Sequence, residues 1–196
     1  MDERTLAAYD DKAAHYCDDW LGQPLPEDIQ VLWRRFFVLG GASADIGSGS
    51  GRDVDWLNRN GYPCTGFDAS EGLLAEARQR FPRWQFAQSA LPGLQGVAAS
   101  SFGNVVCETV LMHLPVAQVR PAARSLARLL SPGGTLYLSW RVTAAEDIRD
   151  PAGRLYCAFA VQDIRDELAG LQLLYDVEEI SQSSGKRVHR LIARSA

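Results

Sequence analysis

The sequence has few lysines, histidines and cysteines, and no long apolar run. Two of its 196 residues are lysine, three are histidine and four are cysteine. No apolar stretch reaches the roughly 18 residues that a membrane-spanning helix needs. The first residues, MDERTLAAYDDK, are acidic where a signal peptide is basic and then apolar. These absences predict a cytoplasmic protein with no membrane partner.

The cysteines exclude two common kinds of site. Cys17, Cys64, Cys107 and Cys157 lie more than 40 residues apart, so no CxxC pair is present to chelate zinc or to form a redox couple. Cys64 and Cys107 fall in apolar runs, where a thiol packs as a small hydrophobic group. We therefore expect buried thiols and no metal site.

The charges are balanced and scattered. The 20 basic and 24 acidic residues give a net charge of −4, and 46% of the residues are apolar, as in one ordinary globular domain. Arg120, Arg124 and Arg128 form a stripe at four-residue spacing, which we interpret as a solvated helix face. A second group of basic residues, interpreted in the same way, comprises Lys186, Arg187, His189, Arg190 and Arg194. No nucleic-acid partner is expected.

Short apolar runs alternate with amphipathic segments through most of the chain. The runs predict strands over residues 42–46, 64–67, 84–87, 102–107 and 135–140, and the segments predict helices over residues 52–59, 71–81 and 116–130. A turn at 131–134 is expected to stop the third of these helices. This alternation indicates an α/β fold with a parallel sheet covered on both faces.

The two ends of the chain depart from this alternation. Residues 1–35 are predicted to be helical with a break at 22–26, after which a second helix covers 27–37. Residues 141–156 are polar and precede a helix that continues to about 169. Runs at 173–180 and 187–193, joined by a short glycine-containing connection, predict an antiparallel hairpin.

A glycine-rich turn is the most informative motif. The stretch ADIGSGSGRDV, residues 44–54, leaves a predicted strand and enters a predicted helix, and its alternating glycines allow the backbone to approach a ligand closely. A dinucleotide fingerprint starting at Gly47 needs glycine at position 52, where this sequence has Arg52. Asp45 places a carboxylate beside the turn, which disfavours a pyrophosphate and favours a positively charged ligand.

A second acidic residue ends the next strand. Asp68 lies 21 residues after Gly47, where nucleotide-binding sheets place an acid that accepts hydrogen bonds from ribose hydroxyls. The alternative is that Asp68 only caps the helix that begins near Ser70.

With these motifs, the chain resembles a class I S-adenosylmethionine-dependent methyltransferase of the small bacterial kind. The resemblance is carried by residues 44–51, 65–70, 86–92, 104–114 and 129–140, about half of the chain. It implies a Rossmann-like, seven-stranded, mostly parallel sheet with a C-terminal hairpin. It also implies S-adenosylmethionine as cofactor and S-adenosylhomocysteine as product. We expect a single domain with a helical cap (1–37), a cofactor core (38–140), an acceptor-side segment (141–160) and a C-terminal helix and hairpin (161–196).

The resemblance assigns roles around the cofactor. Gly47, Ser48 and Gly49 would contact its methionyl part, with Asp45 near the amino group. Arg52 would pair with the carboxylate, unless it is only a solvated helix residue. Asp68 would hold the ribose. Contacts around the adenine would come from Ala69, Ser70, Ser89 and Ala90. The family's usual aspartate after the third strand is missing, so Ser89, Gln88 or a backbone carbonyl would replace it.

The fourth strand leads to the reacting groups that the resemblance implies. Glu108 and Thr109 would lie near the sulfonium, and Glu108 would stabilise its positive charge. His113 would act as general base, or would be a structural residue. Candidate acceptor-binding residues are Tyr9, Tyr16, Arg141 and Tyr156.

The predicted reaction is methyl transfer to a small molecule by in-line displacement, which depends mainly on alignment and exclusion of water. A peptide or an RNA end stays open as acceptor. One alternative function is a catalytically silent protein that binds the same cofactor. Another is a nicotinamide-dependent oxidoreductase, which Arg52 and the lack of a Tyr-x-x-x-Lys pair disfavour. The oligomeric state is not determined by the sequence.

Overall fold

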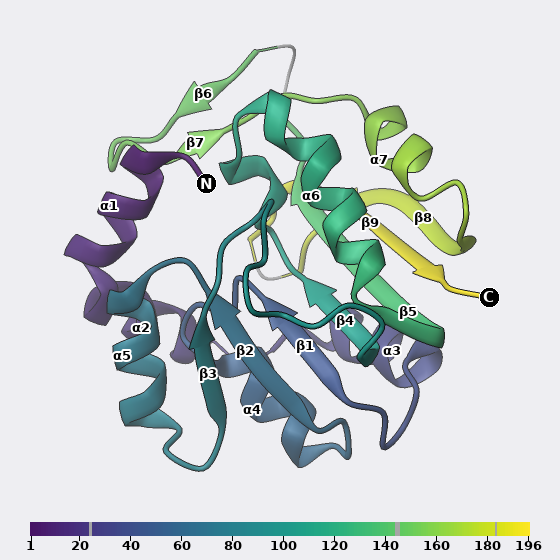
Figure 1. Cartoon of the computed structure of the whole chain (residues 1–196). Helices are drawn as coiled ribbons and strands as arrows, with labels where there is room; N and C mark the ends of the chain where they lie inside the picture. The colour runs from purple at the N-terminus through teal and green to yellow at the C-terminus, as the bar shows by residue number, and fades with distance from the viewer. Residues whose placement is uncertain (24, 144–145, 183) are drawn as a thin grey trace.

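A seven-stranded sheet forms the centre of the structure, a computed structural model that describes residues 1–23, 25–143, 146–182 and 184–196. The strand order is β3-β2-β1-β4-β5-β9-β8 (Figure 1). The strands are β1 (Ser43–Ile46), β2 (Cys64–Asp68), β3 (Gln85–Gln88), β4 (Phe102–Cys107), β5 (Leu130–Arg141), β8 (Gln172–Ile180) and β9 (Arg187–Arg194). The pairs among β1 to β5 are parallel, and β9 is antiparallel to both β5 and β8. The predicted α/β fold with a terminal hairpin is confirmed.

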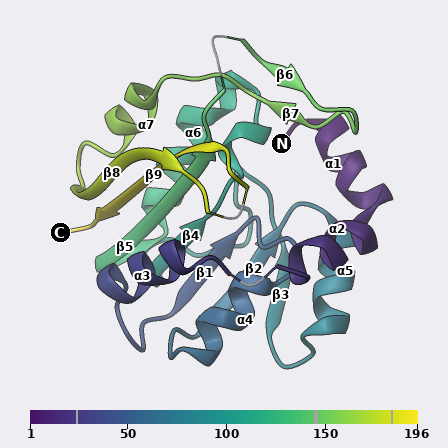
Figure 2. The same ribbon diagram turned by 180° about the vertical axis from the view of Figure 1, so that it is seen from behind.

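Helices cover both faces of this sheet (Figures 1 and 2). They are α1 (Glu3–Asp11), α2 (Ala13–Leu21), α3 (Glu27–Phe36), α4 (Arg52–Arg59), α5 (Glu71–Arg80), α6 (Val116–Arg128) and α7 (Val161–Glu167), with a 3₁₀ turn η1 (Leu111–His113). Successive strand residues point to opposite faces. Val105 and Leu136 therefore pack in the cluster that includes α6 and α7, whereas Val106 and Tyr137 pack in the cluster that includes α3, α4 and α5.

The structure corrects several predicted boundaries. The first helix is split at Lys12, whose φ of −127° and ψ of 25° leave the helical region. Strand β5 extends back to Leu130 through the predicted turn, because Phe102 pairs with Leu130 and the pairing then bulges. The polar segment contains a two-stranded sheet, β6 (Ile148–Arg149) and β7 (Leu155–Tyr156). Pro24 in the predicted break, residues 144–145 in the polar segment and Ser183 in the hairpin connection lie outside the described residues.

The split at Lys12 allows both N-terminal helices to dock. Asp10 of α1 accepts hydrogen bonds from Ser70 Oγ (2.6 Å) and from the Gly72 N–H (3.1 Å) at the start of α5. Buried Thr5 accepts the N–H of Leu155 at 2.8 Å. Helix α1 is therefore tied to two distant segments and stands at the carboxyl ends of the strands (Figure 1).

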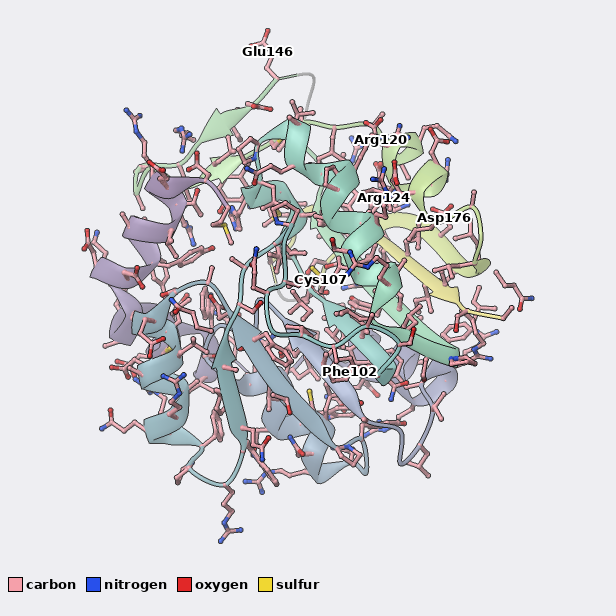
Figure 3. The ribbon with its side chains drawn as sticks, viewed as in Figure 1. Phe102, Cys107, Arg120, Arg124, Glu146 and Asp176 are labelled. Carbon is pink, nitrogen blue, oxygen red and sulfur yellow. The ribbon has the colours of Figure 1, made fainter. Side chains whose placement is uncertain are left out.

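The basic groups expected to be solvated are largely paired. On α6, Arg120 and Arg124 lie on the side that faces α7 (Figure 3). Both reach Glu167 of α7, at 2.9 and 2.8 Å. In the hairpin, Arg190 is buried and its Nη1 lies 2.6 Å from Glu179. The α6 stripe is exposed, as interpreted, and forms surface ion pairs with α7. For the second group the interpretation as a simple solvated face is wrong, because His189 and Arg190 are buried beside carboxylates of β8.

The cysteine thiols are buried, and the described part of the chain has neither a metal-binding cluster nor a membrane-spanning helix. All four cysteines are unpaired and buried, and Cys107 lies inside the sheet (Figure 3). Among the described residues, no cluster of three or more His, Cys, Asp or Glu side chains could hold a metal ion. No helix in these ranges is long and apolar enough to cross a membrane. The cytoplasmic location stays a prediction.

Helix α6 provides a test of the core. Leu126 is fully buried, whereas Val116 on the same helix is 56% exposed. We expect Leu126→Ala to lower the free energy of unfolding by about 2–5 kcal/mol, because a cavity remains in the core. The matched surface change Val116→Ala should alter it by about 0.5 kcal/mol or less. Urea unfolding measures both, and equal effects would contradict the packing of α6 on the sheet.

Candidate functional site

A cavity of about 470 Å³ opens at the carboxyl ends of the parallel strands. Predicted site residues that line it are Tyr9, Gly47, Ser48, Gly49, Arg52, Asp68, Ser70, Glu108, Thr109, His113, Arg141 and Tyr156. They come from elements far apart in the sequence, because the carboxyl ends of neighbouring parallel strands meet at one edge of the sheet. The N-terminal helices and the segment around β7 close the cavity on the other side.

Five predicted residues do not line this cavity. Asp45 is buried in β1 below the glycine loop, and Ser89 donates a hydrogen bond to the Gln95 carbonyl at 3.1 Å. Tyr16 stacks on Trp20, with ring centroids 5.5 Å apart. The other two are Ala69 and Ala90. Direct contact with a ligand stays a prediction for all five.

The glycine loop is shaped by close neighbours. Gly47 has a φ of +83°, and a Cβ there would lie 2.3 Å from a methyl group of Val110. Gly49 has a φ of +51°, and its Cβ would lie 3.0 Å from the Trp20 ring. Between them, the buried Ser48 hydroxyl has no hydrogen-bond partner in the described residues. The loop thus lies against its neighbours, and the Ser48 hydroxyl is directed toward Gly66 of β2.

Asp68 connects this loop to the second strand. Its Oδ2 accepts the N–H of Gly49 at 2.8 Å and its Oδ1 accepts the N–H of Ser70 at 2.9 Å. The N-cap of α5 is Ser70, whose hydroxyl accepts the N–H of Leu73 at 3.1 Å. Asp68 is therefore not the helix cap, and its carboxylate borders the cavity.

Acidic side chains cluster around the glycine loop. Burial raises the pKa values of Asp45 and Asp68, and the nearby Asp53 carboxylate raises that of Asp45 further. Arg52 is partly buried, and its Nε lies 2.8 Å from Asp53. Arg52 is thus paired with its neighbour, and its contact with a cofactor carboxylate stays a prediction. A cationic ligand would lower these raised pKa values, so the acidic cluster favours positive charge in the cavity.

Glu108 extends the acidic region across β4 and β5. Tyr137 and Ser139 donate their hydroxyls to Glu108 Oε2, at 2.7 and 2.6 Å. Burial raises the pKa of Glu108, while these two hydrogen bonds counteract the rise. The carboxylate is thus held in one orientation at the cavity wall.

His113 is enclosed by hydrogen bonds. Its Nδ1 lies 2.6 Å from the Leu155 carbonyl and its Nε2 lies 3.0 Å from the Tyr9 hydroxyl. A carbonyl only accepts, so Nδ1 carries the proton and Nε2 accepts from Tyr9. Burial lowers the pKa of His113 to about 4. His113 is therefore neutral near pH 7, with its lone pair already engaged.

Several residues that line the cavity were not among the predicted site residues. Asp53 and Trp20 border the glycine loop, and Arg154 stands over the rings of Tyr9 and Tyr16, 5.4 and 4.9 Å from their centroids. Asp53 follows Arg52 directly in the first turn of α4. This position next to the glycine loop could have indicated that Asp53 borders the ligand site. Nothing in the local sequence of α2 distinguishes Trp20 from a packing residue.

Comparison with known families agrees with this geometry. The sequence profile of a family described as "Methyltransferase domain" matches residues 44–138, from β1 through most of β5. The chain contains a class I S-adenosylmethionine-dependent methyltransferase domain. The expected family is confirmed, and the cofactor of this family is S-adenosylmethionine.

The methyltransferase domain is similar to curated enzymes over part of their length. A ubiquinone biosynthesis O-methyltransferase of Xanthomonas oryzae is 29% identical over 120 residues, covering 58% of this chain and 48% of that protein. A trans-aconitate 2-methyltransferase of Methylobacterium nodulans is 34% identical over 116 residues, covering 57% and 41%. The match thus spans about half the length of these curated relatives or less.

A solved structure shares the methyltransferase fold. The 1,6-didemethyltoxoflavin-N1-methyltransferase of Burkholderia thailandensis, solved with its substrate and S-adenosylhomocysteine, superposes with a TM-score of 0.73. The match covers 97% of this chain and 88% of that one at 20% identity. At this identity the likeness concerns the fold.

The cavity of the methyltransferase domain suits the cofactor's chemistry. The glycine loop lines the cavity and leaves no room for side chains at Gly47 and Gly49, so a ligand can approach its backbone. The Asp68 carboxylate at the cavity can accept hydroxyl donors, and the Glu108 carboxyl also lines it. The described residues therefore fit a ligand that carries ribose hydroxyls and positive charge.

Asp68 can be tested by replacing its carboxylate with an amide, which removes the charge and one acceptor oxygen. We expect Asp68→Asn to weaken S-adenosylhomocysteine binding about tenfold or more, because hydrogen bonds to a charged acceptor are the stronger kind. Calorimetry measures the affinity, and circular dichroism checks that the variant is folded. Asp163→Asn on α7, away from the cavity, is the matched control. Unchanged affinity in Asp68→Asn would exclude Asp68 from ligand binding.

His113 predicts a pH dependence of stability. Because its folded pKa of about 4 lies below the ordinary value of 6.5, the unfolded chain binds more protons between these values, and stability falls as pH falls. Between pH 7 and pH 5 this group should remove about 2 kcal/mol from the free energy of unfolding.

Urea unfolding at both pH values provides the measurement. His113→Asn should lose less stability than the wild type over this interval, because the titrating group is gone. The control His15→Asn, at an exposed position on α2, should behave as the wild type. Equal pH dependence in His113→Asn and the wild type would contradict a buried neutral imidazole.

Proposed function

We propose that the protein transfers a methyl group from S-adenosylmethionine to a small-molecule acceptor. The observation that supports this best is one continuous cavity with two different walls. The glycine loop, Asp68 and Glu108 form one wall, and Tyr9, Tyr156 and Arg141 belong to the other. A volume of about 470 Å³ is in the range of small-ligand sites.

The similar proteins support a small acceptor. By name, the two curated relatives act in ubiquinone biosynthesis and on trans-aconitate, and the solved structure contains 1,6-didemethyltoxoflavin. We further propose that residues 38–140 hold the cofactor, while residues 1–37 and 141–160 select the acceptor. Docking of α1 on α5 and on β7 supports this division, because it encloses the cavity.

The chain's own residues would supply alignment and electrostatics. When bound, S-adenosylmethionine supplies a methyl group on a sulfonium, whose sulfur keeps the electron pair of the broken bond. Glu108, held by Tyr137 and Ser139, stabilises positive charge at the cavity wall. The enclosed walls position the acceptor lone pair and exclude water.

His113 has a more specific proposed part. Its Nε2 accepts the Tyr9 hydroxyl, so it fixes that hydroxyl at the cavity rather than presenting a free lone pair to an acceptor. With a pKa of about 4 it is also a weak base. We therefore propose His113 as a positioning residue for Tyr9, with a general base required only if the acceptor has to lose a proton.

Ligand binding separates the proposed function from the nicotinamide alternative. We expect calorimetry to show binding of S-adenosylmethionine and S-adenosylhomocysteine and no binding of NADH, because Asp45 and Asp53 repel a pyrophosphate near the loop. Gly49→Val should abolish binding of both sulfur ligands, since a side chain there meets Trp20. The control Gly133→Val, where a side chain meets open space, should leave their affinity unchanged. Binding of NADH alone would contradict the proposal.

Turnover separates the enzyme from a silent binding protein. Small-molecule acceptors bearing hydroxyl, amine, thiol or carbanion-forming groups are incubated with the protein and S-adenosylmethionine, and S-adenosylhomocysteine formation is measured. The proposal expects formation with at least one class. Tight cofactor binding without turnover on any class would support the silent alternative.

A further inference from the structure

Three arginines line the cavity, and they differ in their partners. Arg52 lies 2.8 Å from Asp53, and Arg154 lies 2.7 Å from Asp150. Arg141, at the end of β5, makes no ion pair with any described residue. The four residues outside the described ranges are Pro24, Ala144, Ala145 and Ser183, none of which carries a carboxylate side chain.

Arg141 is nonetheless held in place. Its backbone N–H lies 3.1 Å from Met112 Sδ, and its backbone pairs with Val188 of β9. Its guanidinium stands over the Tyr156 ring, 5.1 Å from the ring centroid. No described residue accepts a hydrogen bond from the guanidinium N–H groups, so they remain available to a planar anion.

The position of Arg141 favours the acceptor over the cofactor. In the sheet, β4 separates β5 from β1, and strands lie about 4.8 Å apart, so its backbone is roughly 10 Å from the strand that carries the glycine loop. Arg52 stands beside that loop and is better placed for a cofactor carboxylate. Glu108 borders the cavity from the end of β4, which lies between these two regions.

The side chains around Arg141 are mostly apolar. Met112, Tyr156 and Val188 are 6, 7 and 4% exposed, and all three line the cavity. Arg141 itself is partly exposed, so water can solvate its guanidinium in the cavity, and a ligand that displaces this water has to replace its hydrogen bonds and charge. An uncharged acceptor would leave this guanidinium unpaired.

From this arrangement we infer that the methyl acceptor is a small carboxylic acid with a mostly apolar skeleton, whose carboxylate binds Arg141. This inference rests on the proposed function for the identity of the cavity. It concerns the carboxylate as the group that anchors the acceptor, and a guanidinium binds a carboxylate through two parallel hydrogen bonds.

Matched acids and amides test the inference on the protein saturated with S-adenosylhomocysteine. The probes are 4-hydroxybenzoate with 4-hydroxybenzamide, 4-hydroxycinnamate with its amide, and hexanoate with hexanamide, all measured by calorimetry. We expect at least one acid to bind about tenfold or more tightly than its amide. Arg141→Gln should remove this preference, and Arg141→Lys should retain part of it. Arg128→Gln, an exposed arginine on α6, should retain all of it.

The outcomes distinguish this inference from the proposed function. S-adenosylhomocysteine should bind Arg141→Gln with wild-type affinity, which also shows that the variant is folded. Weaker binding of S-adenosylhomocysteine to that variant would place Arg141 on the cofactor and overturn the inference. The absence of any acid preference in the wild type, or its persistence in Arg141→Gln, would do the same. A wild-type protein that binds no S-adenosylhomocysteine would contradict the proposed function instead, and the acid preference would then be measured on the protein alone.

Discussion

The Asp68 carboxylate joins the two loops on which the cavity depends. Its oxygens accept the N–H groups of Gly49 and Ser70, so the glycine loop after β1 and the start of α5 after β2 hold a fixed separation. Burial raises the pKa of Asp68, whereas these backbone donors favour its charged form. One side chain therefore both shapes the ligand site and carries charge into it.

That charge has a cost to the folded chain. Asp53 and Asp68 both raise the pKa of Asp45, and Arg52 is the cation that lowers it. Buried carboxylates without sufficient positive charge destabilise a fold. A cationic ligand would relieve this repulsion, so the same carboxylates that weaken the protein alone would strengthen its complex. Stability and ligand binding are thus coupled through one group of residues.

The N-terminal helices complete the site through polar contacts rather than a large apolar interface. Thr5, Tyr9 and Asp10 of α1 reach β7, η1 and α5 respectively. The apolar cluster below them is small, with Ala13, Cys17 and Leu73 as its buried members. Because few buried apolar side chains lie between helices α1 and α2 and the rest of the fold, the docking of these helices depends on specific hydrogen bonds.

The sequence by itself determined the α/β fold and the positions of the glycine loop and Asp68, because periodicity and motif spacing are local properties. Tertiary structure decided what depends on contacts between distant residues. Tyr9 meets His113 across 104 positions and occupies its Nε2. Arg120 and Arg124 find Glu167, whereas Arg141 finds no carboxylate among the described residues. Which charged side chains form ion pairs depends on which helices and strands pack together, and a local sequence pattern does not show this packing.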